Sequence, residues 1–267
     1  MSDAFSEPGK AVAVTIAKQP KQNRIPWNPW LAVGFVIVVY FLTQIIAAVL
    51  VALWPAFMHW SPSRSQNWLD TSINAQFFFV LIAEGLVVLA VYQFLRFYHR
   101  GWGSIGFRRP KWTDLAVGIA IAPLYYLIYL LVIAVAGWLV PALDVDQAQQ
   151  LGFDPVGTWQ LVLTFISLVL IPPFVEELLM RGYLYSSLKK GLPVLGAALV
   201  TSAVFAAAHL QFGSGAPLLW VAAIDTFVLS LFLVWLREKT GSLWSGITLH
   251  ALKNAIAFFA LFIFATS

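Results

Sequence analysis

The 267-residue chain contains no cysteine, which excludes disulfides, thiolate metal sites and cysteine nucleophiles. It is also poor in charge: Asp, Glu, Lys and Arg make up 10% of its residues, where soluble domains have about 25%. Hydrophobic residues reach 60%, and the mean hydropathy is +0.81. These values exclude a soluble globular domain and a disordered chain. The net charge of +4 does not indicate nucleic-acid binding, because the 12 Trp and 21 Phe lie in long apolar runs rather than beside a basic stripe.

Long apolar runs are the main feature that the sequence does have. A helix that spans a bilayer needs about 20 mostly apolar residues, and none of the runs alternates like a barrel strand. We therefore predict an all-α polytopic membrane bundle of about seven transmembrane helices, with eight as the alternative because 159–190 could form two pieces. The predicted spans are Leu31–Trp54, Ser72–Leu95, Leu115–Val140, Trp159–Val175, Leu192–His209, Pro217–Leu236 and Leu243–Ala265.

The basic residues predict the orientation of the chain. Three regions are expected: an N-terminal tail (1–30), a three-helix membrane region (31–158) and a second membrane region (159–267). Of the 16 Lys and Arg, 14 fall in the tail and in every second connection. Arg64 lies in one of the remaining connections, and Lys253 lies in a predicted helix. Because basic connections favour the cytoplasmic side, we expect a cytoplasmic N-terminus. The short tail without an organelle signal favours a bacterial inner membrane.

Several ionisable side chains interrupt the apolar runs. Each costs about 2.5–3.5 kcal/mol on insertion scales, so it needs a partner and marks a candidate site. Glu177 and Arg181 are four residues apart and predict a structural ion pair on one helix face. Lys253 is expected to be neutralised by Asp225 or Glu84, and a proton or ion path through these three is the alternative. The full set is Glu84, Glu176, Glu177, Arg181, His209, Asp225, His250 and Lys253, with Asn254 as a neutral companion.

A pair of prolines comes just before one of these acids. Proline in a helix interior removes a hydrogen bond and clashes with the preceding turn. Pro172 and Pro173 therefore predict a break or kink just before Phe174, with Glu176 near the start of a new helical stretch. An acid that merely suits the first turn of a helix is the alternative interpretation.

The two membrane histidines each share a helix face with a residue four positions away. Phe205 pairs in this way with His209, and His250 with Asn254. In an antiparallel hairpin, Glu176 and His209 lie nearly level. Counting residues along its own helix, His250 reaches the depth of Glu176 and His209 only if the hairpin over 183–197 projects beyond the membrane.

A carboxylate, two histidines and an amide can together hydrolyse a peptide bond without a covalent intermediate. The carboxylate acts as general base on a water that one histidine holds. The second histidine and the amide donate hydrogen bonds to the developing oxyanion. The alternative is a zinc ion bound by Glu176, His209 and His250, although the chain lacks a compact HExxH helix. We expect no cofactor, with zinc as that alternative.

Three short motifs then carry a resemblance. The stretch from Glu176 to Gly182, EELLMRG, matches an EExxxR motif; FAAAH ending at His209 matches FxxxH; and HALKN ending at Asn254 matches HxxxN. In this order, on successive membrane helices, they resemble the CPBP family of intramembrane proteases, which includes the type II CAAX prenyl endopeptidases and the Abi-like proteins. The resemblance covers about 159–260, so region 159–267 is the expected catalytic region.

The resemblance implies a glutamate-dependent intramembrane endopeptidase. It implies that Glu176 activates water with His209 as its partner, that His250 and Asn254 stabilise the oxyanion, and that Glu177 and Arg181 are motif positions. Members of the family act on prenylated CAAX proteins or are linked to peptide maturation and bacteriocin immunity. The expected partners are the lipid bilayer and a peptide or lipidated protein, with no nucleic acid. A non-catalytic scaffold or immunity protein of the same fold, and a transporter, are the alternatives.

Overall fold

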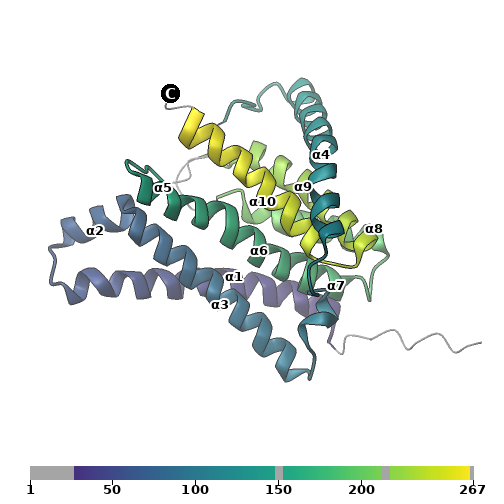
Figure 1. Ribbon diagram of the computed structural model, residues 1–267, viewed down its shortest axis with the longest axis horizontal. Helices are drawn as coiled ribbons and strands as arrows, with labels where there is room; N and C mark the ends of the chain where they lie inside the picture. Colours follow the sequence, from purple (N-terminus) through teal and green to yellow (C-terminus); the bar gives the residue numbers. More distant parts are fainter. Residues whose placement is uncertain (1–26, 148–152, 212–216, 265–267) are drawn as a thin grey trace, which may run out of the picture.

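The computed structural model describes residues 27–147, 153–211 and 217–264, and these residues form helices joined by connections, without a strand (Figure 1). The predicted tail and its basic residues lie almost wholly outside this part of the chain. The α-helices are α1 (Pro29–Phe57), α2 (Pro62–Thr71), α3 (Ile73–Phe97), α4 (Trp112–Leu139), α5 (Thr158–Phe165), α6 (Ile171–Glu177), α7 (Ser186–Leu188), α8 (Val194–Ala208), α9 (Trp220–Thr240) and α10 (Trp244–Phe259). Tighter or wider turns are the 3₁₀ turn η1 (Trp102–Ile105) and the π turns η2 (Ile166–Leu170), η3 (Leu178–Tyr185) and η4 (Ala260–Phe264).

Six helical runs in the described residues are long and apolar enough to cross a membrane, and α8 is a shorter apolar helix. The all-helical membrane bundle with about seven spans is thus confirmed. The helix from Thr158 to Leu188 is one 31-residue run, so 159–190 does not divide into two spans. At 15 residues, α8 is about 22 Å long, less than the roughly 30 Å of a hydrocarbon core. Helix α2 was not predicted, because its sequence is polar and its start depends on the capping residues Ser61 and Pro62.

The helix is continuous through the two prolines, so the predicted break is absent. The turn η2 widens just before them, so that Ile171 N–H donates to the carbonyl of Ile166, five residues back. Pro172 then occupies an early position of α6, where a missing N–H is tolerated. Glu176 therefore lies well inside a continuous helical run rather than at its start.

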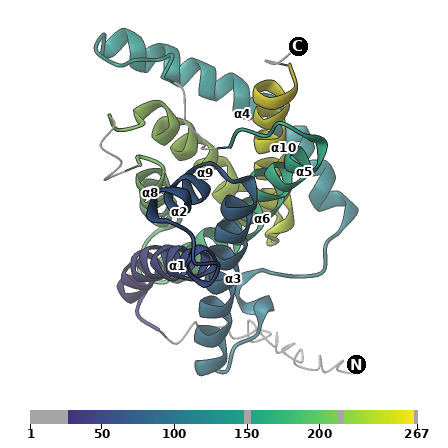
Figure 2. The same cartoon turned by 90° about the vertical axis from the view of Figure 1, so that its left-hand side faces the viewer.

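The long central helix is the element around which the others are arranged. In Figures 1 and 2, α5 and α6 run through the middle of the molecule, with α3 on one side and α10 on the other, and both helices contact α6. Helix α1 packs along α3, α8 packs along α9, and α4 crosses α9 and α10 at the edge. The two membrane regions expected from the sequence therefore meet along the helix that carries Glu176.

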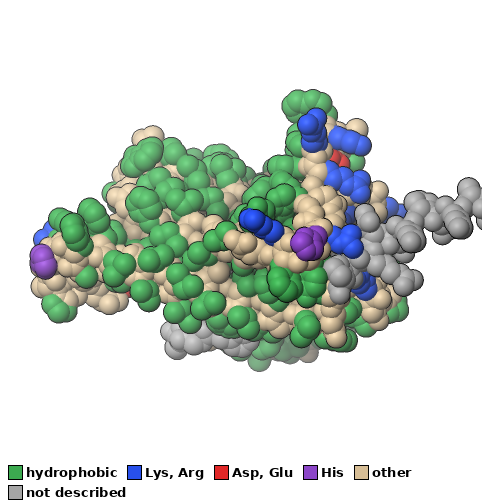
Figure 3. Space-filling model, turned by 90° about the horizontal axis from the view of Figure 1, so that it is seen from below, with side chains coloured by type: hydrophobic (Ala, Val, Ile, Leu, Met, Phe, Trp, Pro, Cys, Tyr) green, Lys and Arg blue, Asp and Glu red, His purple; other side chains and the backbone are tan. Residues whose placement is uncertain are grey.

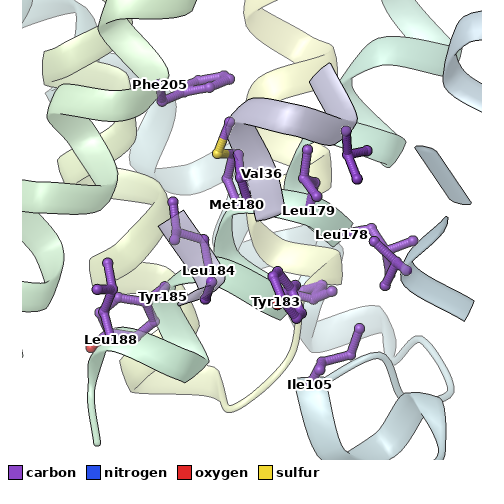
Figure 4. Packing of buried hydrophobic residues seen from close by; sticks show 14 of the residues in the cluster. Val36, Ile105, Leu178, Leu179, Met180, Tyr183, Leu184, Tyr185, Leu188 and Phe205 are labelled. Carbon is purple, nitrogen blue, oxygen red and sulfur yellow. The ribbon is translucent and has the colours of Figure 1, made fainter. Parts of the chain in front are cut away.

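The main hydrophobic core surrounds the second half of this central helix. All eight residues of η3 are buried, and Figure 4 shows Tyr183 and Leu184 among neighbours that include Val36 of α1 and Ile105 of η1. Trp27, just before α1, belongs to this core, and its indole N–H donates to Ser187 Oγ at 2.7 Å. Burial on every side fixes the position of η3, which contains Arg181 of the EExxxR motif, in the bundle.

The basic connections lie together, as their alternation along the chain predicts. Lys189 Nζ, just after α7, is 2.6 Å from Glu238 Oε2 near the end of α9. The indole N–H of Trp244, at the start of α10, donates to the carbonyl of Arg108 at 2.7 Å. These two contacts bring together the connections α7–α8, η1–α4 and α9–α10. Figure 3 shows Lys and Arg side chains gathered mainly toward one end of a largely apolar face. Arg181, one of the 14 basic residues counted toward the tail and the alternate connections, lies fully buried inside the helix. The chain is an integral membrane protein.

Candidate active site

A cavity of about 250 Å³ lies between the N-terminal helices and the helices that carry the motifs. Glu176 of α6 and His209, at the end of α8, both line it. The structure thus brings together a carboxylate and a histidine that are 33 positions apart in the sequence. The other polar lining residues are Tyr40, Thr43 and Gln44 of α1, Glu84 of α3 and Gln211.

The end of α8 fixes the orientation of the His209 ring. His209 N–H bonds to the carbonyl of Ala206, three residues back, in a tightened last turn. The carbonyl of Phe205, one residue earlier, lies 2.9 Å from His209 Nδ1. A carbonyl only accepts, so Nδ1 carries the proton of this bond, and in the neutral ring Nε2 is left as an acceptor.

His250 lies between the two acids of the EExxxR motif. Its Nε2 is 3.7 Å from Glu176 Oε2, and its Nδ1 is 3.6 Å from Glu177 Oε1. The side chain is 5% exposed, so both contacts are shielded from solvent. A residue of α10 thereby contacts both carboxylates of the central helix.

Glu177 and Arg181 form the ion pair that their spacing predicts. Arg181 Nη1 lies 2.9 Å from Glu177 Oε1, and the two side chains are 0% and 1% exposed. The guanidinium also lies over the ring of Phe205, 4.4 Å from its centroid. The same ring packs edge-on against His209 and His250, with centroids 4.8 and 5.9 Å apart. Phe205 therefore joins the ion pair to both histidines.

Lys253 and Asp225 form a second ion pair, on α10 and α9. Lys253 Nζ is 2.9 Å from Asp225 Oδ2, and the hydroxyl of Tyr125 on α4 donates to Asp225 Oδ1. Of the two acids expected to neutralise Lys253, the structure therefore pairs it with Asp225. Glu84 instead lines the cavity beside Glu176.

Asn254 contacts the main chain of the central helix. Its Nδ2 donates to the carbonyl of Leu168 at 2.8 Å. Like His250, it is not among the cavity-lining residues in the described part of the chain, whereas Glu176 and His209 are. Its oxyanion role stays a prediction from the resemblance.

Sequence reasoning missed the wall that α1 contributes. Tyr40 and Gln44 line the cavity from one face of a long apolar helix, and the Tyr40 hydroxyl is 3.5 Å from the carbonyl of Ala208. The available signal was their spacing, since polar side chains four apart share a face. Neither is ionisable at neutral pH, so a search for intramembrane charges passed over them.

The described residues contain no group of three or more His, Cys, Asp or Glu side chains arranged to hold a metal ion. The alternative zinc ligands Glu176, His209 and His250 are near one another but do not form such a group.

Comparison with known proteins gives a family for the second half of the chain. Residues 158–256 match the family model described as type II CAAX prenyl endopeptidase Rce1-like. Neither a curated protein nor a solved structure matches the chain. The match contains all three motifs, and the resemblance to the CPBP and CAAX protease family is thereby confirmed.

Proposed function

We propose that this membrane protein, whose residues 158–256 match the family model of type II CAAX prenyl endopeptidases (Rce1-like), hydrolyses a peptide bond with water activated by Glu176 and His209. The family supports a CAAX-type intramembrane protease in general. The observation that carries the glutamate mechanism is the cavity that both side chains line, with His250 Nε2 3.7 Å from the Glu176 carboxylate.

The chemistry starts with a water between Glu176 and His209. Glu176 removes a proton from the water as its oxygen attacks the scissile carbonyl carbon, and His209 Nε2 accepts the second water hydrogen in a hydrogen bond. His250 donates a hydrogen bond to the carbonyl oxygen as it becomes negative. Glu176 then returns the proton to the amide nitrogen, the C–N bond breaks, and an amine and a carboxylic acid leave.

The substrate class follows from the position of the site. The cavity lies inside an apolar bundle, so we propose a membrane-associated peptide or protein as substrate, including a prenylated CAAX-type protein. The clustered basic connections favour a cytoplasmic N-terminus and presentation of the substrate from the cytoplasm. We retain the bacterial inner membrane as the proposed location.

The experiment is cleavage of a membrane-presented peptide library, with half of the peptides farnesylated, by the full chain in proteoliposomes. Wild type is compared with Glu176→Gln and His209→Ala, each with and without a zinc chelator. Loss of cleavage in both variants, with no effect of the chelator, supports the glutamate mechanism. Inhibition by chelator and recovery with added zinc would replace it with the metal mechanism.

A non-catalytic scaffold or immunity role predicts a different pattern. It predicts no cleavage by a correctly folded wild type and full biological activity in Glu176→Gln. Thermal unfolding of each variant, measured beside the cleavage assay, separates this outcome from a folding defect.

A further inference from the structure

The hydrogen bond from Asn254 has a specific reason in the sequence of the central helix. A carbonyl in an α-helix accepts from the N–H four residues later, and in a π turn from the N–H five residues later. For Leu168 these donors would belong to positions 172 and 173. Both are proline, which has no N–H. The Leu168 carbonyl therefore has no main-chain donor in either helical register.

Asn254 supplies the missing donor. Its Nδ2 lies 2.8 Å from the Leu168 carbonyl oxygen, across the interface between α10 and the turn η2. An unpaired carbonyl inside an apolar bundle is unfavourable, so this bond stabilises the widened turn that the prolines require. It also holds α10 against the helix that carries Glu176.

We infer that Asn254 is a positioning residue, which replaces the N–H groups that Pro172 and Pro173 lack and so sets the register of His250 against Glu176. His250 is one turn before Asn254 on α10, and Glu176 is two turns after Leu168 on the central helix. A fixed link between Asn254 and Leu168 therefore determines how His250 Nε2 and the Glu176 carboxylate approach each other, 3.7 Å apart. This inference rests on the proposed function for its consequence in catalysis, but the link itself does not.

The test is a double-mutant cycle that restores a main-chain donor. Asn254→Ala removes the side-chain donor, and Pro172→Ala supplies an N–H at the position from which an α-helix would bond to Leu168. We expect Asn254→Ala to lower kcat about 10- to 100-fold with little change in KM, because the reacting groups are misplaced. The kcat of the double variant Asn254→Ala/Pro172→Ala is expected to be at least tenfold higher than that of Asn254→Ala. A direct oxyanion role for Asn254 predicts instead that Pro172→Ala recovers none of it, which would overturn the inference.

A second measurement tests the link without any activity. Because the chain has no cysteine, Trp159→Cys on α5 and Ile256→Cys on α10 introduce the only two sites for spin labels, and both positions are exposed. Asn254→Ala is expected to broaden the distribution of the label-to-label distance, and adding Pro172→Ala to narrow it again. An unchanged distribution in Asn254→Ala would refute the positioning role. A changed distribution in a protein that cleaves no peptide would refute the proposed function and leave the link standing.

Discussion

Breaking the buried pair of Glu177 and Arg181 is expected to be far more costly than breaking an exposed pair of the same charges. Glu177→Gln leaves the Arg181 guanidinium buried against the Phe205 ring, with a neutral amide in place of the carboxylate that lies 2.9 Å from it. Removing one member of a buried pair costs about 3–5 kcal/mol, because the remaining charge stays desolvated. The chain offers a matched control, since Lys189 and Glu238 form a pair at 2.6 Å whose side chains are 39% and 27% exposed. Glu238→Gln is expected to cost about 0.2–1 kcal/mol.

The assay is equilibrium unfolding in mixed detergent micelles, followed by circular dichroism. A third variant, Glu177→Leu/Arg181→Met, removes both charges and fills the same space with apolar atoms. It is expected to recover most of the loss, because an apolar pair of similar volume needs no desolvation of charge. Equal costs for Glu177→Gln and Glu238→Gln would refute the reasoning, since burial would then have no effect on the pair.

Three further predictions concern packing and charge. Gly118→Ala places a Cβ 2.6 Å from the Ser245 carbonyl oxygen and should destabilise by about 1–3 kcal/mol in the same unfolding assay, whereas Gly85→Ala, with open space around it, should not. Lys253→Met leaves Asp225 with the Tyr125 hydroxyl but without its ammonium partner, and we expect a loss of about 1.5–3 kcal/mol that Lys253→Arg largely avoids. Phe205→Leu removes the ring that contacts Arg181, His209 and His250, and should lower kcat about tenfold or more with an unchanged helical circular dichroism spectrum.

The class of fold was predictable because a bilayer allows few solutions. Runs of about 20 apolar residues can only be spanning helices, and the observed helices agree with the predicted spans to within a few residues at most ends. The clearest error was at Pro172 and Pro173. Proline rules predict a lost hydrogen bond there, but they do not reveal that Asn254, 86 positions after Leu168, supplies the donor. That compensation is tertiary and has no local signal.

The candidate site was predictable in its residue types and less so in its contacts. Spacing identified the Glu177–Arg181 pair, because residues four apart in a helix are neighbours. It left open whether Lys253 pairs with Asp225 or Glu84, since depth along a helix does not give the direction in which a side chain points. The contacts of Phe205 with both histidines depend on how α8 and α10 cross, which helix periodicity within each segment does not determine.

The most direct test of the proposed function compares two carboxylates that line the same cavity. Turnover of a cleaved membrane peptide is measured in proteoliposomes for Glu176→Gln and for Glu84→Gln, with the unfolding midpoint of each variant as the check on folding. If Glu176 is the base that activates water, Glu176→Gln lowers kcat by about 10²–10⁴-fold, and Glu84→Gln lowers it by much less. Equal rates for wild type and Glu176→Gln would contradict the glutamate mechanism.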